Sequence, residues 1–308
     1  MDISVVIPVY GCRAALPELH RRLVETLQQI TSEFEIVLVD DCCPQNSWEE
    51  IVRICKLDSR VKGIHFSRNF GQIRAITAGL DKSKGDWVVV MDCDLQDRPE
   101  SILDLYKKAQ EGYDVVFARR VERIDSPVTK FLSKCFYKVY DYFTEGTFDS
   151  SICNFSISKR TVIDNYCKMR EHNRAFTMFI RWLGFKETAI DLQADARFEG
   201  KSSYNLKKKI KMALEIITSQ SNKPLLFSIH LGFISALISF AYILYLVVRA
   251  LFVGDVLLGW TTIVASIYLV GGALLAAIGI LGIYIGNIFD EAKNRPLYVI
   301  AESLNSEE

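Results

Sequence analysis

The sequence predicts an α/β fold with a mostly parallel β-sheet, followed by two transmembrane helices. Two observations predict it. Short apolar runs alternate with segments of helical periodicity in the N-terminal part of the chain, and two long runs without charged residues follow near the C-terminus. Strands that alternate with helices form a parallel sheet that is covered on both faces. An apolar run of about 20 residues is long enough to cross a bilayer.

Four short apolar runs are expected to form strands, at 3–8, 34–39, 61–66 and 87–91. Between them lie 14–30, 48–57 and 72–80, which are expected to be helices because their apolar residues recur at helical spacing. In parallel α/β sheets, ligands bind beyond the carboxyl ends of the strands. Tyr10, Asp40 and Asp92 each follow or end such a strand. The sequence therefore predicts a binding site at one edge of the sheet.

No Asp, Glu, Lys or Arg occurs in residues 224–248 or 256–289, which are predicted to lie in the two transmembrane helices. Basic residues flank this pair on both sides, whereas the connection holds only Arg249 and Asp255. By the positive-inside rule, both flanks are cytoplasmic and the connection is external. The N-terminus also lacks the basic and apolar pattern of a secretory signal. The flanking basic residues are Lys207, Lys208, Lys209, Lys211, Lys223, Lys293 and Arg295.

These features divide the chain into four parts. Residues 1–205 form a cytoplasmic α/β domain and 206–223 a juxtamembrane amphipathic helix. Residues 224–289 hold the two transmembrane helices with a short external loop, and 290–308 form a cytoplasmic tail. The lysines beside the apolar face of 206–218 favour a position in the headgroup layer of the bilayer. Residues 128–143 have a similar pattern, for which a surface helix packed on the sheet is an equally good interpretation.

The overall charge is balanced, with 37 basic and 37 acidic residues, and no nucleic acid is expected as a partner. The eight cysteines form no C-x-x-C pair, and the four histidines do not group with them. A zinc site is therefore not expected, and the cysteines are predicted to be free thiols in a reducing compartment. His65 and His172 have no partner pattern and are interpreted as structural residues.

Asp92 and Asp94 are the strongest candidates for chemistry. They directly follow the apolar run 88–91, and the string continues through Gln96. Alternate residues of an extended chain point the same way, so both carboxylates are expected on one side. Oxygen ligands suit a hard divalent cation, and Asp92, Asp94 and Gln96 are predicted to hold Mg²⁺ or Mn²⁺. Such an ion would neutralise the charge that grows on a diphosphate as a bond to it breaks.

Further strings accompany this motif along nearly the whole chain. They are V-I-P-V-Y at 6–10, the acids Asp40 and Asp41, S-R-N-F-G-Q at 67–72, T-A-G-L at 77–80, R-F-E-G-K-S-S-Y at 197–204 and R-P-L-Y at 295–298. Together they resemble the family-2 inverting glycosyltransferases of GT-A fold. Within that family they are similar to the polyprenyl-phosphate branch, which includes dolichol-phosphate mannose synthases and bactoprenol glucosyltransferases.

The resemblance implies that residues 1–205 are a GT-A, Rossmann-like catalytic domain. Such a domain would transfer a sugar from a nucleotide-sugar donor, typically a UDP-sugar, to polyprenyl phosphate at the cytoplasmic face of the membrane. Asp40 and Asp41 would bind the nucleotide, and arginines would bind phosphate oxygens. A surface ion pair explains each arginine alone equally well. The donor-binding residues predicted in this way are Pro8, Tyr10, Asp40, Asp41, Arg68, Gln96, Arg120 and Arg123, and the phosphate-binding residues are Arg197 and Ser202.

One position departs from the family pattern. Several relatives carry an acid, proposed as the catalytic base, where this chain has Asn154. Either Asp149 or another acid replaces it, or no base is needed. A phosphate acceptor is largely dianionic at pH 7 and is already a nucleophile, whereas an alcohol acceptor needs a general base. Asn154 therefore favours a phosphate acceptor, and the predicted catalytic residues are Asp94, Asn154 and Asp149.

Two other functions compete with this interpretation. Processive polysaccharide synthases of the same superfamily carry Q-x-x-R-W, of which this chain keeps Arg181 and Trp182 without the Gln. A non-catalytic membrane scaffold or flippase partner is the second alternative, although it would have no need of the metal ligands. Gly282 and Gly286 form a G-x-x-x-G motif, which suits either close helix packing or a contact between subunits of a homo-oligomer.

Overall fold

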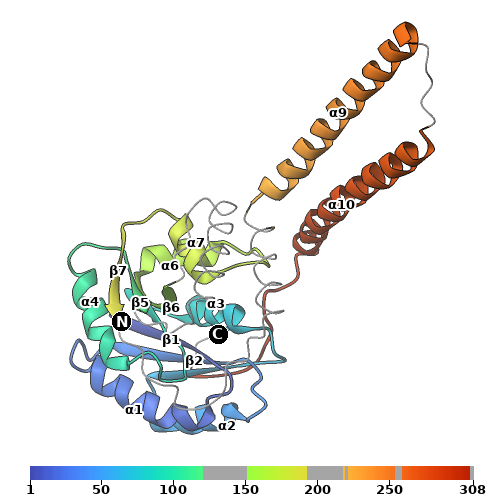
Figure 1. Cartoon of the computed structure of the whole chain (residues 1–308). Coiled ribbons are helices and arrows are strands. Elements are labelled where there is room, and N and C mark those ends of the chain that lie inside the picture. Colours follow the sequence, from blue (N-terminus) through green and yellow to red (C-terminus); the bar gives the residue numbers. More distant parts are fainter. Residues whose placement is uncertain (121–150, 193–217, 219–220, 254–258, 306–308) are drawn as a thin grey trace.

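The computed structural model describes residues 1–120, 151–192, 218, 221–253 and 259–305. Within them, an α/β domain is followed by two long helices that project away from it (Figure 1). The amphipathic segments predicted at 128–143 and 206–218 lie outside the described residues, except for Thr218.

An eight-stranded sheet forms the centre of the domain, with the strand order β7-β5-β6-β4-β1-β2-β3-β8. Neighbouring strands are parallel except where β6 or β8 takes part, since these two run antiparallel to the others. The predicted mostly parallel sheet is confirmed. The strands are β1 (Ile3–Val9), β2 (Phe34–Asp40), β3 (Val61–Phe66), β4 (Trp87–Val90), β5 (Val115–Arg120), β6 (Ile152–Lys159), β7 (Glu187–Leu192) and β8 (Ile300–Leu304).

Helices cover both faces of the sheet, as strands that are buried on both sides require (Figure 1). One face packs against α1 (Leu16–Leu27), α2 (Ser47–Leu57) and α4 (Ile102–Ala109). The other packs against α3 (Gln72–Lys82), α6 (Arg160–Lys168) and α7 (Phe176–Trp182). The glycine of the T-A-G-L string lets α3 approach β1 closely, because a Cβ built on Gly79 would lie 2.3 Å from Val6 Cγ1.

The segment after the second long helix returns to the sheet. Residues 300–304, which the sequence assigned to a tail, form β8 and pair with the outer edge of β3. The R-P-L-Y string anchors this return. Tyr298 stacks on Phe66 with ring centroids 5.4 Å apart and donates a 2.6 Å hydrogen bond to Asp81 Oδ2. Leu297 beside it is buried.

The two long helices are α9 (Lys223–Val253) and α10 (Trp260–Ala292). Their segments Lys223–Tyr242 and Ser266–Ala292 are long and apolar enough to cross a membrane, and neither is buried in the structure. They are candidate membrane spans. At the base of α10, the backbone N–H of His172 donates a 2.7 Å hydrogen bond to Glu291, which fixes the helix to the α/β domain.

The G-x-x-x-G motif of α10 makes no close contact in this chain. A Cβ built on Gly282 or Gly286 would meet no atom of the described residues within 4 Å. Close packing of this face against the described part of α9 is therefore not observed, and a contact between subunits stays a prediction.

Cys12 and Cys93 form a disulfide, with their Cα atoms 6.2 Å apart. The prediction of free thiols is wrong for this pair. The two cysteines are 81 positions apart in sequence, but they follow the neighbouring strands β1 and β4. The bond therefore ties the loop after β1 to the loop that carries Asp92 and Asp94. The other described cysteines are free, namely Cys42, Cys43, Cys55, Cys153 and Cys167.

A buried carboxylate links four segments near the amino ends of the parallel strands. Glu35 of β2 is fully buried and accepts 2.5 Å hydrogen bonds from the Ser4 hydroxyl and the Lys84 backbone N–H. Its other oxygen lies 2.5 Å from Lys62 Nζ of β3. Burial alone would raise the pKa of Glu35, but the hydrogen bonds from Lys62, Ser4 and Lys84 outweigh it and lower this pKa below its ordinary value.

We expect Glu35→Ala to reduce the free energy of unfolding by about 3–5 kcal/mol, because it leaves the side chain of Lys62, only 13% exposed, without its partner. Denaturant unfolding of the full chain in detergent measures this change. The matched control is Glu33→Ala at an exposed position two residues away, which should stay within about 0.5 kcal/mol of wild type. Since the folded pKa is lowered, the contribution is present at neutral pH and is lost as pH falls through that pKa. Equal stabilities of the two variants would contradict the assignment.

Candidate functional site

The carboxyl ends of β1, β2, β3 and β4 meet at one edge of the sheet, because these four strands are parallel neighbours. The loop that follows β4 carries the acids predicted to hold a metal. It is not extended as predicted, since the chain turns at residues 93–94 and Leu95 has a φ of +58°. Burial nevertheless alternates along the loop, and Asp92, Asp94 and Gln96 are all half-buried between buried neighbours. Solvent can therefore still reach the side chains of all three predicted ligands.

Gln72, the first residue of α3, also contacts this loop, although it was not among the predicted metal ligands. Gln72 Nε2 donates a 2.7 Å hydrogen bond to Asp92 Oδ1. The backbone N–H of Gln96 donates a 3.2 Å hydrogen bond to Asp94 Oδ1. Within the described ranges, no three His, Cys, Asp or Glu side chains are grouped as metal ligands. Two carboxylates with an amide still fit Mg²⁺ or Mn²⁺, because such ions commonly take their remaining ligands from substrate phosphates and water.

Asp41 shapes the loop that joins β3 to α3. Its carboxylate accepts hydrogen bonds from the backbone N–H groups of Phe70 and Gly71, at 2.6 and 2.9 Å. Gly71 has a φ of +98°, a backbone conformation that favours glycine. Burial raises the pKa of Asp41, and the two backbone donors act against that rise. The same short loop therefore reaches Asp41 through Gly71 and Asp92 through Gln72.

Asp40 is also buried, with 1% of its side chain exposed. Its carboxylate lies 2.7 Å from His65 Nδ1 and accepts a 3.3 Å hydrogen bond from the backbone N–H of Cys43. Burial raises the pKa of Asp40 above its ordinary value, and the hydrogen bond with His65 offsets only part of this rise. Direct contact of Asp40 and Asp41 with a nucleotide stays a prediction, since in this structure their oxygens hold protein groups.

The remaining predicted donor residues differ in exposure. Pro8 is buried within β1, whereas Tyr10 just beyond the strand is 54% exposed. Tyr10 is thus the aromatic surface available beside a base. Arg68 is exposed, and its guanidinium lies 4.1 Å from the centroid of the Phe70 ring. Arg120 ends β5, which runs in the same direction as β4 because β6 between them is antiparallel to both, and so β5 ends at the same edge of the sheet.

Asn154 lies in β6, the neighbour of β4, and the loop after β4 carries Asp92 and Asp94. The antiparallel register between β6 and β4 ends with Ser156 opposite Val90, so Asn154 and Asp92 each lie two residues beyond the last pair. The side chain is half-buried. A catalytic role for Asn154 stays a prediction. Arg123, Asp149, Arg197 and Ser202 lie outside the described residues, and their roles stay predictions.

Arg181 and Trp182 lie away from this edge. Arg181 Nε makes a 2.8 Å ion pair with Glu187, the first residue of β7. Glu187 pairs with Val115, which begins β5. Both residues mark the amino ends of their strands, whereas Asp92 follows the carboxyl end of β4. An acceptor sugar held by Arg181 and Trp182 would lie at the wrong edge, which disfavours the processive-synthase alternative.

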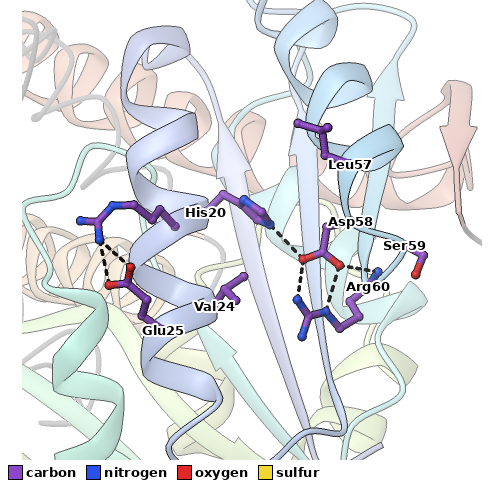
Figure 2. Close-up of a pocket in the computed structure, with 8 residues that line it drawn as sticks. His20, Val24, Glu25, Leu57, Asp58, Ser59 and Arg60 are labelled. Atoms are coloured by element: carbon purple, nitrogen blue, oxygen red, sulfur yellow. Dashed lines mark hydrogen bonds and ion pairs between the residues drawn. The ribbon is translucent and has the colours of Figure 1, made fainter.

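A surface pocket of about 450 Å³ opens between α1 and the connection from α2 to β3 (Figure 2). Its charged groups pair with one another. Asp58 lies 3.1 Å from His20 Nε2 and accepts hydrogen bonds from Arg60, which lower the pKa of Asp58 to about 2. The pocket sits before the first residue of β3, at the edge opposite to Asp92. We therefore place the candidate site at the carboxyl edge and not in this pocket.

Known proteins resemble this chain over nearly its whole length. The sequence profile described as Glycosyl transferase family 2 matches residues 4–182, which include β2 to β6 and all of β1 except its first residue. The chain is 36% identical over 308 residues to the uncharacterized glycosyltransferase YkcC of Bacillus subtilis (strain 168), covering 100% of this chain and 95% of the relative. It is 32% identical over 303 residues to the uncharacterized glycosyltransferase sll0501 of Synechocystis sp., covering 98% and 95%. It is 34% identical over 304 residues to the bactoprenol glucosyl transferase of Shigella phage SfII, covering 98% of both chains.

Proposed function

The chain belongs to glycosyl transferase family 2, and from this premise we propose that it transfers a sugar from a UDP-sugar donor to polyprenyl phosphate in the membrane. The family match confirms the resemblance from which the GT-A fold was predicted. The lipid acceptor is supported by relatives named bactoprenol glucosyl transferase, since bactoprenol is a polyprenyl lipid. The same name makes glucose the first sugar to test.

One arrangement carries the proposal. β1 lies between β2 and β4, so the exposed Tyr10, the acid Asp40 and the half-buried Asp92 and Asp94 lie at the ends of three adjacent strands or just beyond them. A nucleoside diphosphate is elongated, and its base and diphosphate can occupy neighbouring parts of such an edge. The same chain continues into two exposed apolar helices, which supports an acceptor that resides in the bilayer.

The reaction requires mainly that the protein stabilise charge on the leaving diphosphate and hold the donor and the acceptor in position. An acceptor phosphate oxygen forms a bond to the anomeric carbon, the bond from that carbon to the diphosphate breaks with inversion, and the nucleoside diphosphate leaves. A dianionic phosphate has no proton on its attacking oxygen, so Asn154 need not accept one. Asp92, Asp94 and Gln96 would hold Mg²⁺ or Mn²⁺, which would neutralise charge on the leaving diphosphate. The neutral Asn154 adds no negative charge beside the incoming phosphate.

The membrane arrangement forms part of the same proposal, in which α9 and α10 both cross the bilayer and both termini are cytoplasmic. β3 and β8 share one sheet, so the segments before and after the helical pair must lie on the same side. Two crossings satisfy this condition and one crossing does not. The basic residues on both flanks support the cytoplasmic side. Arg197 and Ser202 would meet the lipid phosphate near the membrane surface.

The experiment is sugar transfer by the full chain in vesicles, with labelled UDP-glucose, UDP-galactose, UDP-N-acetylglucosamine and GDP-mannose offered in turn together with a polyprenyl phosphate. We expect one UDP-sugar to yield a labelled product that extracts with the lipid. A labelled polymer in the aqueous phase would favour a processive synthase instead. A protein that neither transfers the sugar nor slowly hydrolyses any donor would favour the non-catalytic scaffold.

A further inference from the structure

The acid at the end of β2 is held by a histidine. Asp40 Oδ2 lies 2.7 Å from Nδ1 of His65, which is its partner in the β2–β3 register. An ionised carboxylate only accepts hydrogen bonds, so the imidazole donates from Nδ1. The other oxygen accepts the hydrogen bond from the backbone N–H of Cys43. These two donors fix the direction in which the remaining lone pairs of Asp40 point.

His65 is held in turn from the C-terminal strand. Its ring stacks on the indole of Trp48, with centroids 5.1 Å apart and an interplanar angle of 24°. Trp48 Nε1 donates a 3.0 Å hydrogen bond to Glu302, and Glu302 stands opposite His65 in the β3–β8 register. Asn305 fastens the end of β8 by donating a 2.8 Å hydrogen bond to the Val61 carbonyl.

We propose that His65 is a positioning residue for the nucleotide of the donor, held in place by Trp48 of α2, which is itself fixed by Glu302 of β8. The inference rests on the proposed function, in which Asp40 accepts hydrogen bonds from the base or ribose. Without His65, the buried carboxylate loses a hydrogen-bond donor and can turn away or take a proton. A protonated acid offers fewer acceptor positions. β8 thus supports Asp40 indirectly, through Glu302, Trp48 and His65.

A positioning residue and a purely structural residue differ in what their loss changes. A histidine that only stabilised the sheet would alter the free energy of unfolding and leave the KM for donor unchanged. A histidine that positions Asp40 acts on binding of the nucleotide and not on the bond that breaks. Its loss should therefore raise the donor KM while kcat at saturating donor stays near that of wild type.

The first measurement is the Kd of UDP and of GDP for the full chain in detergent, followed by KM and kcat for the donor. We expect His65→Ala to raise the Kd of the nucleotide that binds wild type by about tenfold, as for loss of a hydrogen bond to a charged group. His65→Asn should restore most of the affinity, because its amide nitrogen takes the place of Nδ1. Unchanged Kd values in His65→Ala would overturn the proposal.

The second measurement tests the contact between Trp48 and Glu302 of β8. It does not require a substitution in the interior of the sheet. Glu302→Ala and Trp48→Phe should each raise the nucleotide Kd by about threefold, the loss of one ordinary hydrogen bond. Glu302→Gln keeps an acceptor for Trp48 and should bind as wild type. Ser303→Ala, an exposed position on the same strand, is the matched control.

A double-mutant cycle then separates a relay through His65 from a general loosening of the edge. If Glu302 acts through His65, Glu302→Ala adds nothing to the Kd of a His65→Ala chain. Equal effects of Glu302→Ala in both backgrounds reject the relay. The expected affinities together with transfer to a water-soluble acceptor would reject only the proposed function. Wild-type affinities in every variant, with lipid-linked product still formed, would reject only this inference. A wild-type chain that binds neither nucleotide rejects both.

Discussion

Asp94→Ala should lower the rate of sugar transfer by at least about 100- to 1,000-fold, the loss that follows removal of one electrostatic stabiliser of a charged transition state. Asp94 stands half-buried in the loop after β4, between the buried Cys93 and Leu95. Its carboxylate is one of two that would hold a divalent ion at the donor diphosphate. We expect Asp94→Asn, which keeps the size and removes the charge, to be impaired nearly as much.

Transfer of labelled sugar to polyprenyl phosphate measures this loss. The matched control is Asp104→Ala, which removes an exposed acid from α4 and should leave the rate unchanged. Excess EDTA should abolish transfer by the wild-type chain, and added Mg²⁺ or Mn²⁺ should restore it. A fully active Asp94→Ala chain, or full turnover in EDTA, would show that the acids after β4 do not serve a metal.

Polyprenyl phosphate should be preferred over the matching polyprenol by a factor of about 100 or more, because the alcohol needs a general base of the kind that contributes 100- to 10,000-fold. Asn154, two residues from the last pair of the β4–β6 register, cannot accept a proton. The rate with the phosphate should fall below about pH 6, where the acceptor gains a proton. Parallel assays with the two lipids over a pH series measure both effects.

Two variants at the same position sharpen this test. Asn154→Ala should cost less than the roughly 100-fold expected for loss of a general base. Asn154→Asp should slow transfer to the phosphate, because it places a negative charge beside an anionic acceptor. Preference for the free alcohol, or faster transfer by Asn154→Asp, would reject the base-free mechanism and direct the search for a base to Asp149.

The first four strands could be read from the sequence because each is a local apolar run, and their common direction follows from the helices between them. The edge of the sheet that carries the candidate site could be predicted for the same reason, since Tyr10, Asp40 and Asp92 mark the ends of such runs. β8 could not be read in this way. Its five residues, Ile300–Leu304, include an acid and a serine, and only the pairing with β3 makes them a strand.

The side-chain contacts within the candidate site could not be predicted from local sequence patterns either. The carboxylates of Asp40 and Asp41 were expected to face a nucleotide, yet they hold His65 and the backbone of Phe70 and Gly71. His65 was interpreted as structural because its partner lies 25 positions away. The disulfide between Cys12 and Cys93 was missed for the same reason, since only the strand order brings the two cysteines together.

The return of the chain to β3 also sets an order of events during biosynthesis. The ribosome makes β8 after both apolar helices, and Asn305 must then find the Val61 carbonyl across 244 residues. Until that moment the nascent chain presents the outer edge of β3 without its strand partner, and unpaired edges invite pairing with other chains. In the proposed membrane arrangement, insertion of α9 and α10 into the bilayer would precede closure of the sheet, and the newly made protein would acquire its complete edge only once it is anchored.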